Sequence, residues 1–270
     1  RNISKNNIDF KVIDNYKLPD FCPNGFFEDN VLNGNWENDT FNIIEYFSDK
    51  NGIFLDIGSW IGPFTLYASK LYKQVYSFEP DTVAFKTILQ NILLNDFDNI
   101  TLIPEALSNE TGKSIFGGNG KLGNSESTLL VQDINNYSSQ ANNMGQRGTP
   151  EYRKQDIIEV DTLTIEDACK KYNINIFDIK LIKIDIEGGE FFLIPQMAKF
   201  LKYIKPVLYI SIHWCFLNEQ DIDLVINTLF EIYCNCYTCE NKRNFKPINL
   251  EDIKNRRITD LLFLDYDFEN

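Results

Sequence analysis

The residues with the clearest chemical potential in this sequence form an acidic, glycine-containing turn. Asp56 lies near the end of the apolar stretch Ile53–Ile57, and Gly58 and Gly62 follow it. Glycine at position 58 permits a sharp turn and a close approach of the backbone to a ligand. Gly62 with Pro63 suits the start of a helix whose free N–H groups face that ligand.

The spacing of this turn is Asp-x-Gly-x-x-x-Gly, whereas dinucleotide-binding enzymes usually carry Gly-x-Gly-x-x-Gly without an acid at the strand end. A carboxylate there repels a pyrophosphate and attracts the ammonium group of an amino acid. The spacing therefore favours S-adenosylmethionine over NAD. A second acid, Glu79, ends the stretch Val75–Glu79 and could hold both ribose hydroxyls. A glycine turn or a strand-end acid alone is also common in α/β folds that bind no such ligand.

Two further predicted strand ends bring an acid–base set to the same side. Asp185 ends one strand and His213, the only histidine, ends the other, with Glu187 and Glu190 following Asp185. Methyl transfer to an aliphatic hydroxyl needs the proton removed, because a free alcohol is a poor nucleophile at neutral pH. His213 or Asp185 could be that base.

Alternatively, two or three of Asp185, Glu187 and His213 could hold a divalent cation such as Mg²⁺ that lowers the pKa of the hydroxyl. His213 could also be a structural histidine at a strand end. Glu190 is interpreted as supporting, because an acid there complements the N-terminus of the next helix.

Tryptophans offer a binding surface for the acceptor. Trp36, Trp60 and Trp214 could stack on a sugar ring, although aromatic residues in such a chain more often belong to the core. Glu105 follows the third predicted strand at its carboxyl end, where it could meet the adenine side of a nucleotide or be a solvated loop acid.

The elements that must position these residues alternate between strands and helices. This alternation, with acids at strand ends, predicts a doubly wound, mostly parallel α/β sheet with an antiparallel closing strand. The predicted strands are 53–57, 75–79, 99–104, 157–161, 180–185, 206–213, 237–240 and 258–265. The predicted helices are 40–47, 63–72, a long helix from 80, 164–172, a helix ending near 201, and 219–233.

Two segments lie outside this alternation. Residues 1–40 are Asn-rich with scattered aromatic residues and predict an irregular N-terminal lid, which leaves 41–270 as the main domain. Residues 117–150 are rich in Gly, Asn, Ser and Gln, with only Thr128–Val131 resembling a strand. A loop this long inside a compact domain predicts a mobile flap on the substrate side.

Composition limits the partners. The 270 residues, 43% of them hydrophobic, can bury one sizeable core. The net charge of −13 argues against a nucleic-acid or anionic-membrane partner and suits a neutral or cationic acceptor. The longest apolar runs are too short to span a membrane, and no leader is visible. Arg1 in place of Met is expected of a domain excised from a longer multidomain chain, or of a chain whose true N-terminus is missing.

Six cysteines are present, three of them spaced Cys-x-Cys-x-x-Cys at Cys234, Cys236 and Cys239. A zinc site needs a fourth ligand and a second pair, and neither is local. We therefore interpret them as thiols of a partly buried strand. Reduced cysteines predict a cytoplasmic location.

Several of these segments together resemble the FkbM-type methyltransferase family. They occur in that family's order over about residues 40–214, and Lys183–Glu190 is the most specific. The segments are Phe54–Gly62, Tyr76–Pro80, Glu105–Ser108, Val160–Leu163, Ile182–Glu190 and Ile212–His213. The resemblance implies a class I (Rossmann-like) S-adenosylmethionine-dependent fold and, usually, O-methylation of hydroxyls on sugars, glycans or polyketide-like products.

By position, the resemblance implies three groups of site residues. The methionine end of the cofactor would meet Asp56, Gly58, Ser59 and Gly62. Its ribose and adenine would meet Phe78, Glu79, Pro80, Glu105 and Ala106, while Asp185, Glu187 and His213 would face the methyl group. The sequence differs from the family at Ser211 and Ile212, where members often carry a glutamate, and in its long flap. Metal use and acceptor class therefore stay open.

The sequence thus predicts an S-adenosylmethionine-dependent O-methyltransferase acting on a sugar or glycan hydroxyl. The alternatives are a methyltransferase of a small natural product or other non-sugar hydroxyl, a nucleotide-sugar or NAD-binding enzyme on the same sheet, and a non-catalytic interaction domain. Asp56 and the missing third turn glycine disfavour the NAD enzyme. Acids are present at four strand ends, which argues against the non-catalytic interaction domain, because a domain that had lost its activity would not need them.

Overall fold

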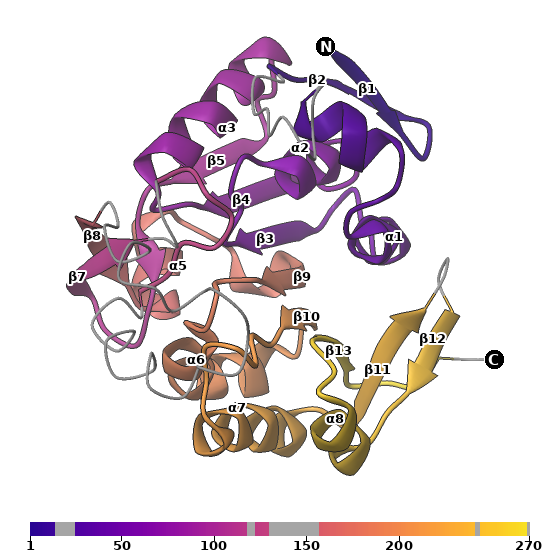
Figure 1. The fold of residues 1–270 in the computed structure, drawn as a ribbon, viewed down its shortest axis with the longest axis vertical. Coiled ribbons are helices and arrows are strands. Elements are labelled where there is room, and N and C mark those ends of the chain that lie inside the picture. Colours follow the sequence, from indigo (N-terminus) through magenta and orange to yellow (C-terminus); the bar gives the residue numbers. More distant parts are fainter. Residues whose placement is uncertain (14–24, 118–121, 130–156, 241–243, 269–270) are drawn as a thin grey trace.

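The structure is a computed structural model that describes residues 1–13, 25–117, 122–129, 157–240 and 244–268. A central sheet carries helices on both faces (Figure 1). Its eight strands lie in the order β12-β11-β13-β10-β9-β3-β4-β5. They are β3 (Ile53–Ile57), β4 (Gln74–Phe78), β5 (Ile100–Ile103), β9 (Ile179–Ile184), β10 (Val207–Ser211), β11 (Asn235–Glu240), β12 (Asn244–Pro247) and β13 (Asp260–Leu264).

Five of these strands, β5, β4, β3, β9 and β10, pair in parallel. β13 is antiparallel to both of its neighbours, β10 and β11. The doubly wound, mostly parallel sheet with an antiparallel closing strand is therefore confirmed. From β3 the chain runs outward through β4 and β5 and then returns to β9 on the other side. Such a reversal of strand order is where open α/β sheets bind ligands.

Helices cover the sheet in two groups. Alternate residues of the central strands face opposite sides, so that Phe54 packs with α1, α2 and α3 while Leu55 packs with α5, α6, α7 and α8. The helices are α1 (Asn38–Tyr46), α2 (Pro63–Ser69), α3 (Thr82–Leu94), α5 (Ile165–Lys171), α6 (Glu190–Ile204), α7 (Glu219–Ile232) and α8 (Leu250–Arg256). Among the residues that the structure describes, no helix is long and apolar enough to cross a membrane.

The N-terminal segment contains regular structure that the sequence prediction did not include. β1 (Asn2–Lys5) and β2 (Ile8–Lys11) form an antiparallel hairpin. Its two turn residues, Asn6 and Asn7, have φ values of 48° and 64°, which asparagine tolerates better than most residues. A π-helix, η1 (Phe27–Leu32), follows. Ile3 and Phe27 are buried in the cluster that holds α1 and α2, so this segment packs on the domain.

A second, three-stranded sheet has the order β6-β8-β7. Its strands are β6 (Ala106–Leu107), β7 (Gly112–Gly117) and β8 (Ile157–Leu163). Of the predicted flap, residues 118–121 and 130–150 lie outside the described residues. The described part, 122–129, returns to β7 through a bridge between Thr128 and Gly117. Of the strand predicted at 128–131, Leu130 and Val131 also lie outside the described residues.

The turn after β3 depends on one glycine. Gly58 has φ +80°, and a Cβ atom there would lie 1.8 Å from the carbonyl oxygen of Asp185. We expect Gly58→Ala to lower the free energy of unfolding by about 3 kcal/mol, because the left-handed backbone and the overlap each cost roughly 1–3 kcal/mol. Gly112→Ala is the matched control, since its new Cβ meets nothing within 4 Å. Urea denaturation measures both variants, and equal stabilities would contradict this account of the turn.

Candidate active site

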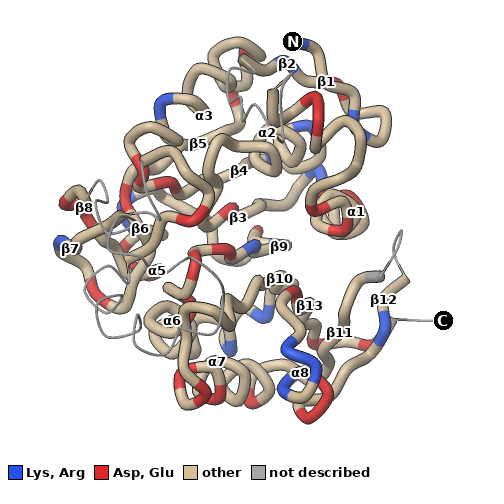
Figure 2. Tube along the Cα trace, in the orientation of Figure 1, with Lys and Arg blue, Asp and Glu red and all other residues tan. Residues whose placement is uncertain are grey.

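A cavity of about 320 Å³ opens over the carboxyl ends of β3, β4, β9 and β10, where the strand order reverses. Figure 2 shows Asp and Glu positions in the loops that follow β4 and β9. The predicted site residues that line this cavity are Gly58, Ser59, Trp60, Phe78, Glu79, Pro80, Ala106, Asp185, Glu187 and His213. Asp56, Gly62, Glu105 and Trp214 are not among the lining residues.

A buried lysine lies beneath the turn after β3. The Lys183 ammonium lies 3.4 Å from Asp56 Oδ1 and 3.5 Å from Asp185 Oδ2, and it donates a hydrogen bond of 3.0 Å to the Gly58 carbonyl oxygen. Burial alone would lower the pKa of Lys183, but the Asp185 and Asp56 carboxylates raise it well above its usual range. Lys183 therefore stays protonated and joins β9 to β3.

Asp56 is part of this buried pair. Its side chain is fully buried, and Thr65 Oγ1 donates to its Oδ2 over 2.6 Å. The carboxylate thus faces Lys183 and Thr65. Its predicted contact with the ammonium group of the cofactor's methionine moiety stays a prediction. Gly62 has φ +87° as the N-cap of α2, and a Cβ atom there would meet the Ile88 side chain. Close packing against α3 is therefore a sufficient reason for glycine at this position.

Glu79 lies at the end of β4 and lines the cavity. Its Oε2 accepts the Trp60 N–H over 2.6 Å and its Oε1 accepts the Asp81 N–H over 2.8 Å. Burial raises the pKa of Glu79 to about 8, although these two N–H groups favour the charged form. Two backbone donors thus hold this buried acid in a fixed position at the edge of the cavity.

Two predicted ligand contacts have other partners in the structure. Glu105 accepts hydrogen bonds from Lys171 and from the Tyr172 hydroxyl, the latter over 2.6 Å. The Trp214 indole N–H donates to the Ile258 carbonyl oxygen over 3.0 Å. These interactions explain both residues without a ligand, so their binding roles stay predictions.

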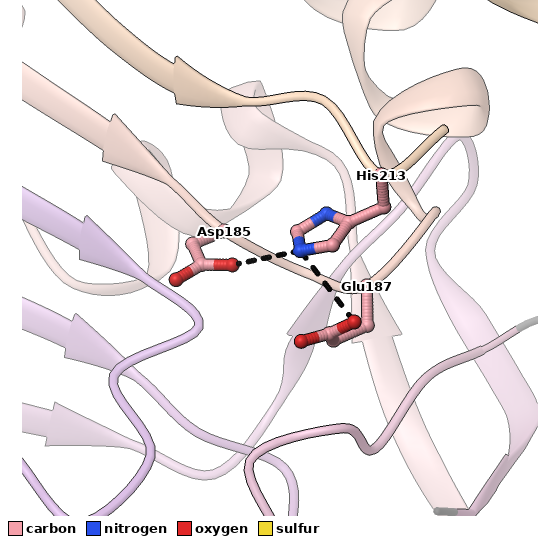
Figure 3. Close-up of side chains that lie close together, drawn as sticks. All are labelled: Asp185, Glu187 and His213. Carbon is pink, nitrogen blue, oxygen red and sulfur yellow. Dashed lines mark ion pairs between the residues drawn. The ribbon is translucent and has the colours of Figure 1, made fainter. Parts of the chain in front are cut away.

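Three predicted catalytic residues meet at one point (Figure 3). His213 Nε2 lies 3.4 Å from Asp185 Oδ1 and 3.5 Å from Glu187 Oε2. His213 Nδ1 lies 3.0 Å from Glu190 Oε1, which is fully buried at the start of α6. Glu187 reaches this point from a left-handed backbone with φ 53°. Glu190 therefore orients the imidazole ring, a role that its sequence position alone did not reveal.

The residues around His213 shift one another's pKa values and so determine which of them are charged. Burial alone would lower the pKa of His213, but Glu190, Asp185 and Glu187 raise it to about 10. Burial raises the pKa of Glu187 to about 8, against the attraction of His213. At neutral pH the imidazole is therefore a cation shared by three carboxyl groups. The ligand atoms of Asp185, Glu187 and His213 also lie within 4.8 Å of one another, a spacing compatible with a metal ion.

Besides Glu126, which lies in the predicted flap, the sequence analysis missed two acids that line the cavity. Glu37 comes from the N-terminal segment with φ 38°, and its carboxylate accepts a hydrogen bond of 3.3 Å from Thr40. Burial and the nearby Asp185 raise the pKa of Glu37 to about 8, while Lys183 opposes this. Asp260, at the start of β13, accepts a hydrogen bond of 2.8 Å from Ser211. Neither acid belongs to a local motif, so no sequence signal marked them.

The strand order, the cavity at its reversal and the acids at the ends of β4 and β9 together define a class I methyltransferase fold. The family model of the methyltransferase FkbM domain matches residues 56–242. The chain therefore belongs to the FkbM methyltransferase family, which confirms the resemblance noted in the sequence.

Solved structures with a similar fold include methyltransferase FkbM from Methylobacillus flagellatus KT, with 17% identity and a TM-score of 0.43. That match covers 79% of this chain and 44% of the other chain, so this chain spans less than half of its length. A putative methyltransferase from Streptococcus mutans, SMU.1697c in complex with SAH, has 14% identity and a TM-score of 0.41, covering 84% of this chain and 96% of that one.

An rRNA methylase from Streptococcus thermophilus has 12% identity and a TM-score of 0.39, with 83% of this chain and 93% of that chain covered. No curated protein matches the chain. At these identities the similarity concerns the fold alone.

The imidazolium of His213 should stabilise the folded protein in a limited pH range. Its pKa of about 10 lies above the usual 6.5, so its contribution is complete below pH 6.5 and is lost as the pH rises through about 10. We expect His213→Gln to lower the free energy of unfolding by about 2 kcal/mol near neutral pH, because three carboxyl groups lose their shared cation. The difference from wild type should shrink toward pH 10.

Urea denaturation of both proteins at several pH values between these limits measures this. Because His213 is the only histidine in the sequence, no other imidazole contributes to the comparison. A difference that stays constant across the range would show that the imidazole is neutral in the folded protein.

Proposed function

We propose that this chain is an S-adenosylmethionine-dependent O-methyltransferase that methylates a sugar hydroxyl. The observation that carries the proposal is that Glu79 and the cluster of Asp185, Glu187 and His213 line one cavity at the strand-order reversal. A cofactor-holding acid and a group that takes a proton are then within reach of the same bound molecules. Membership of the FkbM family supports this reading.

The cavity residues fit the cofactor. Gly58 lines the cavity without a side chain, because a Cβ atom there would overlap the carbonyl oxygen of Asp185. The floor of the cavity at this point is therefore backbone. Glu79 would hold the ribose hydroxyls, and Phe78, Pro80 and Ala106 form an apolar surface beside it that suits adenine. When bound, the cofactor supplies an electrophilic methyl group on a sulfonium. Asp56 would act through Lys183, since its carboxylate faces that ammonium group.

The proton of the acceptor hydroxyl would go to His213. Glu190 accepts from Nδ1, which leaves Nε2 pointing toward Asp185 and Glu187. An acid that fixes the tautomer of a histidine base is a recurrent arrangement in enzymes. The raised pKa makes His213 a strong base that is mostly protonated at neutral pH. Asp185, paired with Lys183 on its other oxygen, is the alternative base.

A divalent cation is the other way to activate the hydroxyl. The donor set of Asp185, Glu187 and His213 fits a cation, and Glu190 on Nδ1 would orient the imidazole ligand. The ion would lower the pKa of the hydroxyl and would compete with the proton on Nε2. One imidazole with two carboxylates does not select Mg²⁺ over other divalent ions.

The lining of the cavity favours a hydroxyl-rich acceptor. Trp36 and Trp60 contribute aromatic side chains to the lining, and Ser211 and Thr259 contribute hydroxyl groups. The net charge of −13 disfavours a nucleic-acid acceptor. The cytoplasmic location and the membership of a longer multidomain chain stay predictions from the sequence.

Thermal unfolding with S-adenosylhomocysteine, NAD or a nucleotide sugar tests the cofactor. At 100 times its dissociation constant a ligand adds about 2.7 kcal/mol, a shift of roughly 5 °C for a chain of this size. We expect this shift with S-adenosylhomocysteine alone, and we expect Glu79→Ala to abolish most of it. Glu231→Gln, on the exposed face of α7, is the control and should keep the shift. A shift with NAD instead would overturn the proposal.

The acceptor and the base are tested by methyl transfer to a panel of methyl glycosides, with Mg²⁺, with Mn²⁺ and with chelator. With chelator present, kcat/KM should rise about tenfold per pH unit toward the His213 pKa of about 10. His213→Gln should lower kcat/KM by roughly 10²–10⁴-fold and remove this rise. A variant that keeps both the rate and the pH profile would exclude His213 as the base.

A further inference from the structure

A short described segment, Gly123–Ser127, forms one side of the cavity; it is called the wall segment below. Asn124, Ser125, Glu126 and Ser127 all line the cavity. The segment belongs to none of the sheets, and both of its ends are hydrogen-bonded to Asp81. The Gly123 N–H donates to Asp81 Oδ2 over 2.6 Å, and the Ser127 hydroxyl donates to the same oxygen over 3.2 Å.

The other carboxylate oxygen of Asp81 binds the first turn of α3. Its Oδ1 accepts the N–H groups of Val83 and Ala84, at 2.8 Å and 3.1 Å, and so caps the N-terminus of α3. The side chain is almost completely buried, with 1% of its surface exposed. One carboxylate oxygen of Asp81 therefore caps α3, and the other binds the wall segment.

These contacts close a ring of hydrogen bonds around Glu79. The Trp60 indole N–H donates to the Gly123 carbonyl oxygen over 2.8 Å, and the Trp60 backbone N–H donates to Glu79 over 2.6 Å. The Asp81 N–H donates to the other oxygen of Glu79. The wall segment is thus connected to the acid that is expected to hold the cofactor ribose.

The same segment shares the cavity with the catalytic cluster. Glu126 and Glu187 both line it, so the two carboxyl groups face the same space. The wall segment therefore lies on the cavity that Glu79 and the cluster at His213 also line. It offers an amide, two hydroxyls and a carboxylate, which are groups that hydrogen-bond to a hydroxylated molecule.

We propose that the wall segment Gly123–Ser127 recognises the acceptor, and that Asp81 is the positioning residue that fixes it beside the cofactor site. This inference rests on the proposed methyltransferase function for the nature of the two ligands. The attachment by Asp81 itself is independent of that function.

Asp81→Asn separates the two tasks of this side chain. Asparagine caps helices as well as aspartate does, so its carbonyl oxygen keeps the bonds to Val83 and Ala84. Its amide group cannot accept from the Gly123 N–H. Asn249→Ala is the matched control, because Asn249 caps α8 through Asp252 and does not line the cavity.

Hydrogen exchange and S-adenosylhomocysteine binding test the positioning role. In Asp81→Asn the Gly123 amide should exchange about tenfold faster, the loss expected for one charge-assisted hydrogen bond, while Val83 and Ala84 keep their protection. The dissociation constant for S-adenosylhomocysteine should rise about threefold to tenfold, and Asn249→Ala should leave it unchanged. Unchanged exchange at Gly123 would overturn the role of Asp81.

Steady-state kinetics test the recognition role with the methyl glycoside that the acceptor panel identifies. Glu126→Gln should raise KM for that glycoside at least fivefold and leave the dissociation constant for S-adenosylhomocysteine unchanged. An unchanged KM would overturn acceptor recognition by the wall segment. If the wild-type protein binds no S-adenosylhomocysteine, the proposed function fails, while the exchange experiment still decides whether Asp81 holds the segment.

Discussion

The site depends on one buried cation, the ammonium group of Lys183. A charge removed from water is stable only when it is paired and hydrogen-bonded, and Asp56, Asp185 and the Gly58 carbonyl oxygen supply that pairing. Through these partners the lysine fixes the turn after β3 against the end of β9. The close approach of Gly58 to the Asp185 carbonyl oxygen is part of the same junction. The contacts of Lys183 therefore position both the turn at Gly58 and the Asp185 carboxylate.

The cavity carries more acids than bases, and its chemistry follows from how they share protons. His213 is held between Asp185, Glu187 and Glu190, which makes it a cation at neutral pH and a strong base above it. Glu37 and Glu79 have pKa values raised to about 8 by burial. Such groups change charge when a ligand or a metal ion enters, because each pKa depends on its neighbours. Binding and proton transfer are thus coupled within the cavity.

The N-terminal segment and the wall segment both line the cavity. Trp36 stacks on Phe64 at 5.1 Å between ring centroids, and Phe26 contacts Trp60, so the N-terminal residues help to form one side of the cavity. The wall segment forms another side through Asp81. The FkbM family model matches residues 56–242, which include the parallel strands that carry the acids and the wall segment, whereas the N-terminal segment lies outside that match. Under the proposed function, we expect these two segments to govern the choice of acceptor, because a fold by itself does not specify a substrate.

The sequence alone indicated the α/β sheet, the family and the convergence of Asp185, Glu187 and His213, because apolar periodicity, short motifs and strand-end acids are local patterns. The strand order and the point where it reverses came from the structure. The sequence did not determine which acids face the cavity. Asp56 and Glu79 both end strands, yet Asp56 pairs with Lys183 beneath the turn while Glu79 lines the cavity. It also gave no sign of Glu37, Asp260 or the bond between Asp81 and Gly123. These depend on contacts between residues far apart in the chain, and only tertiary packing decides which side chains meet and which of them stay charged.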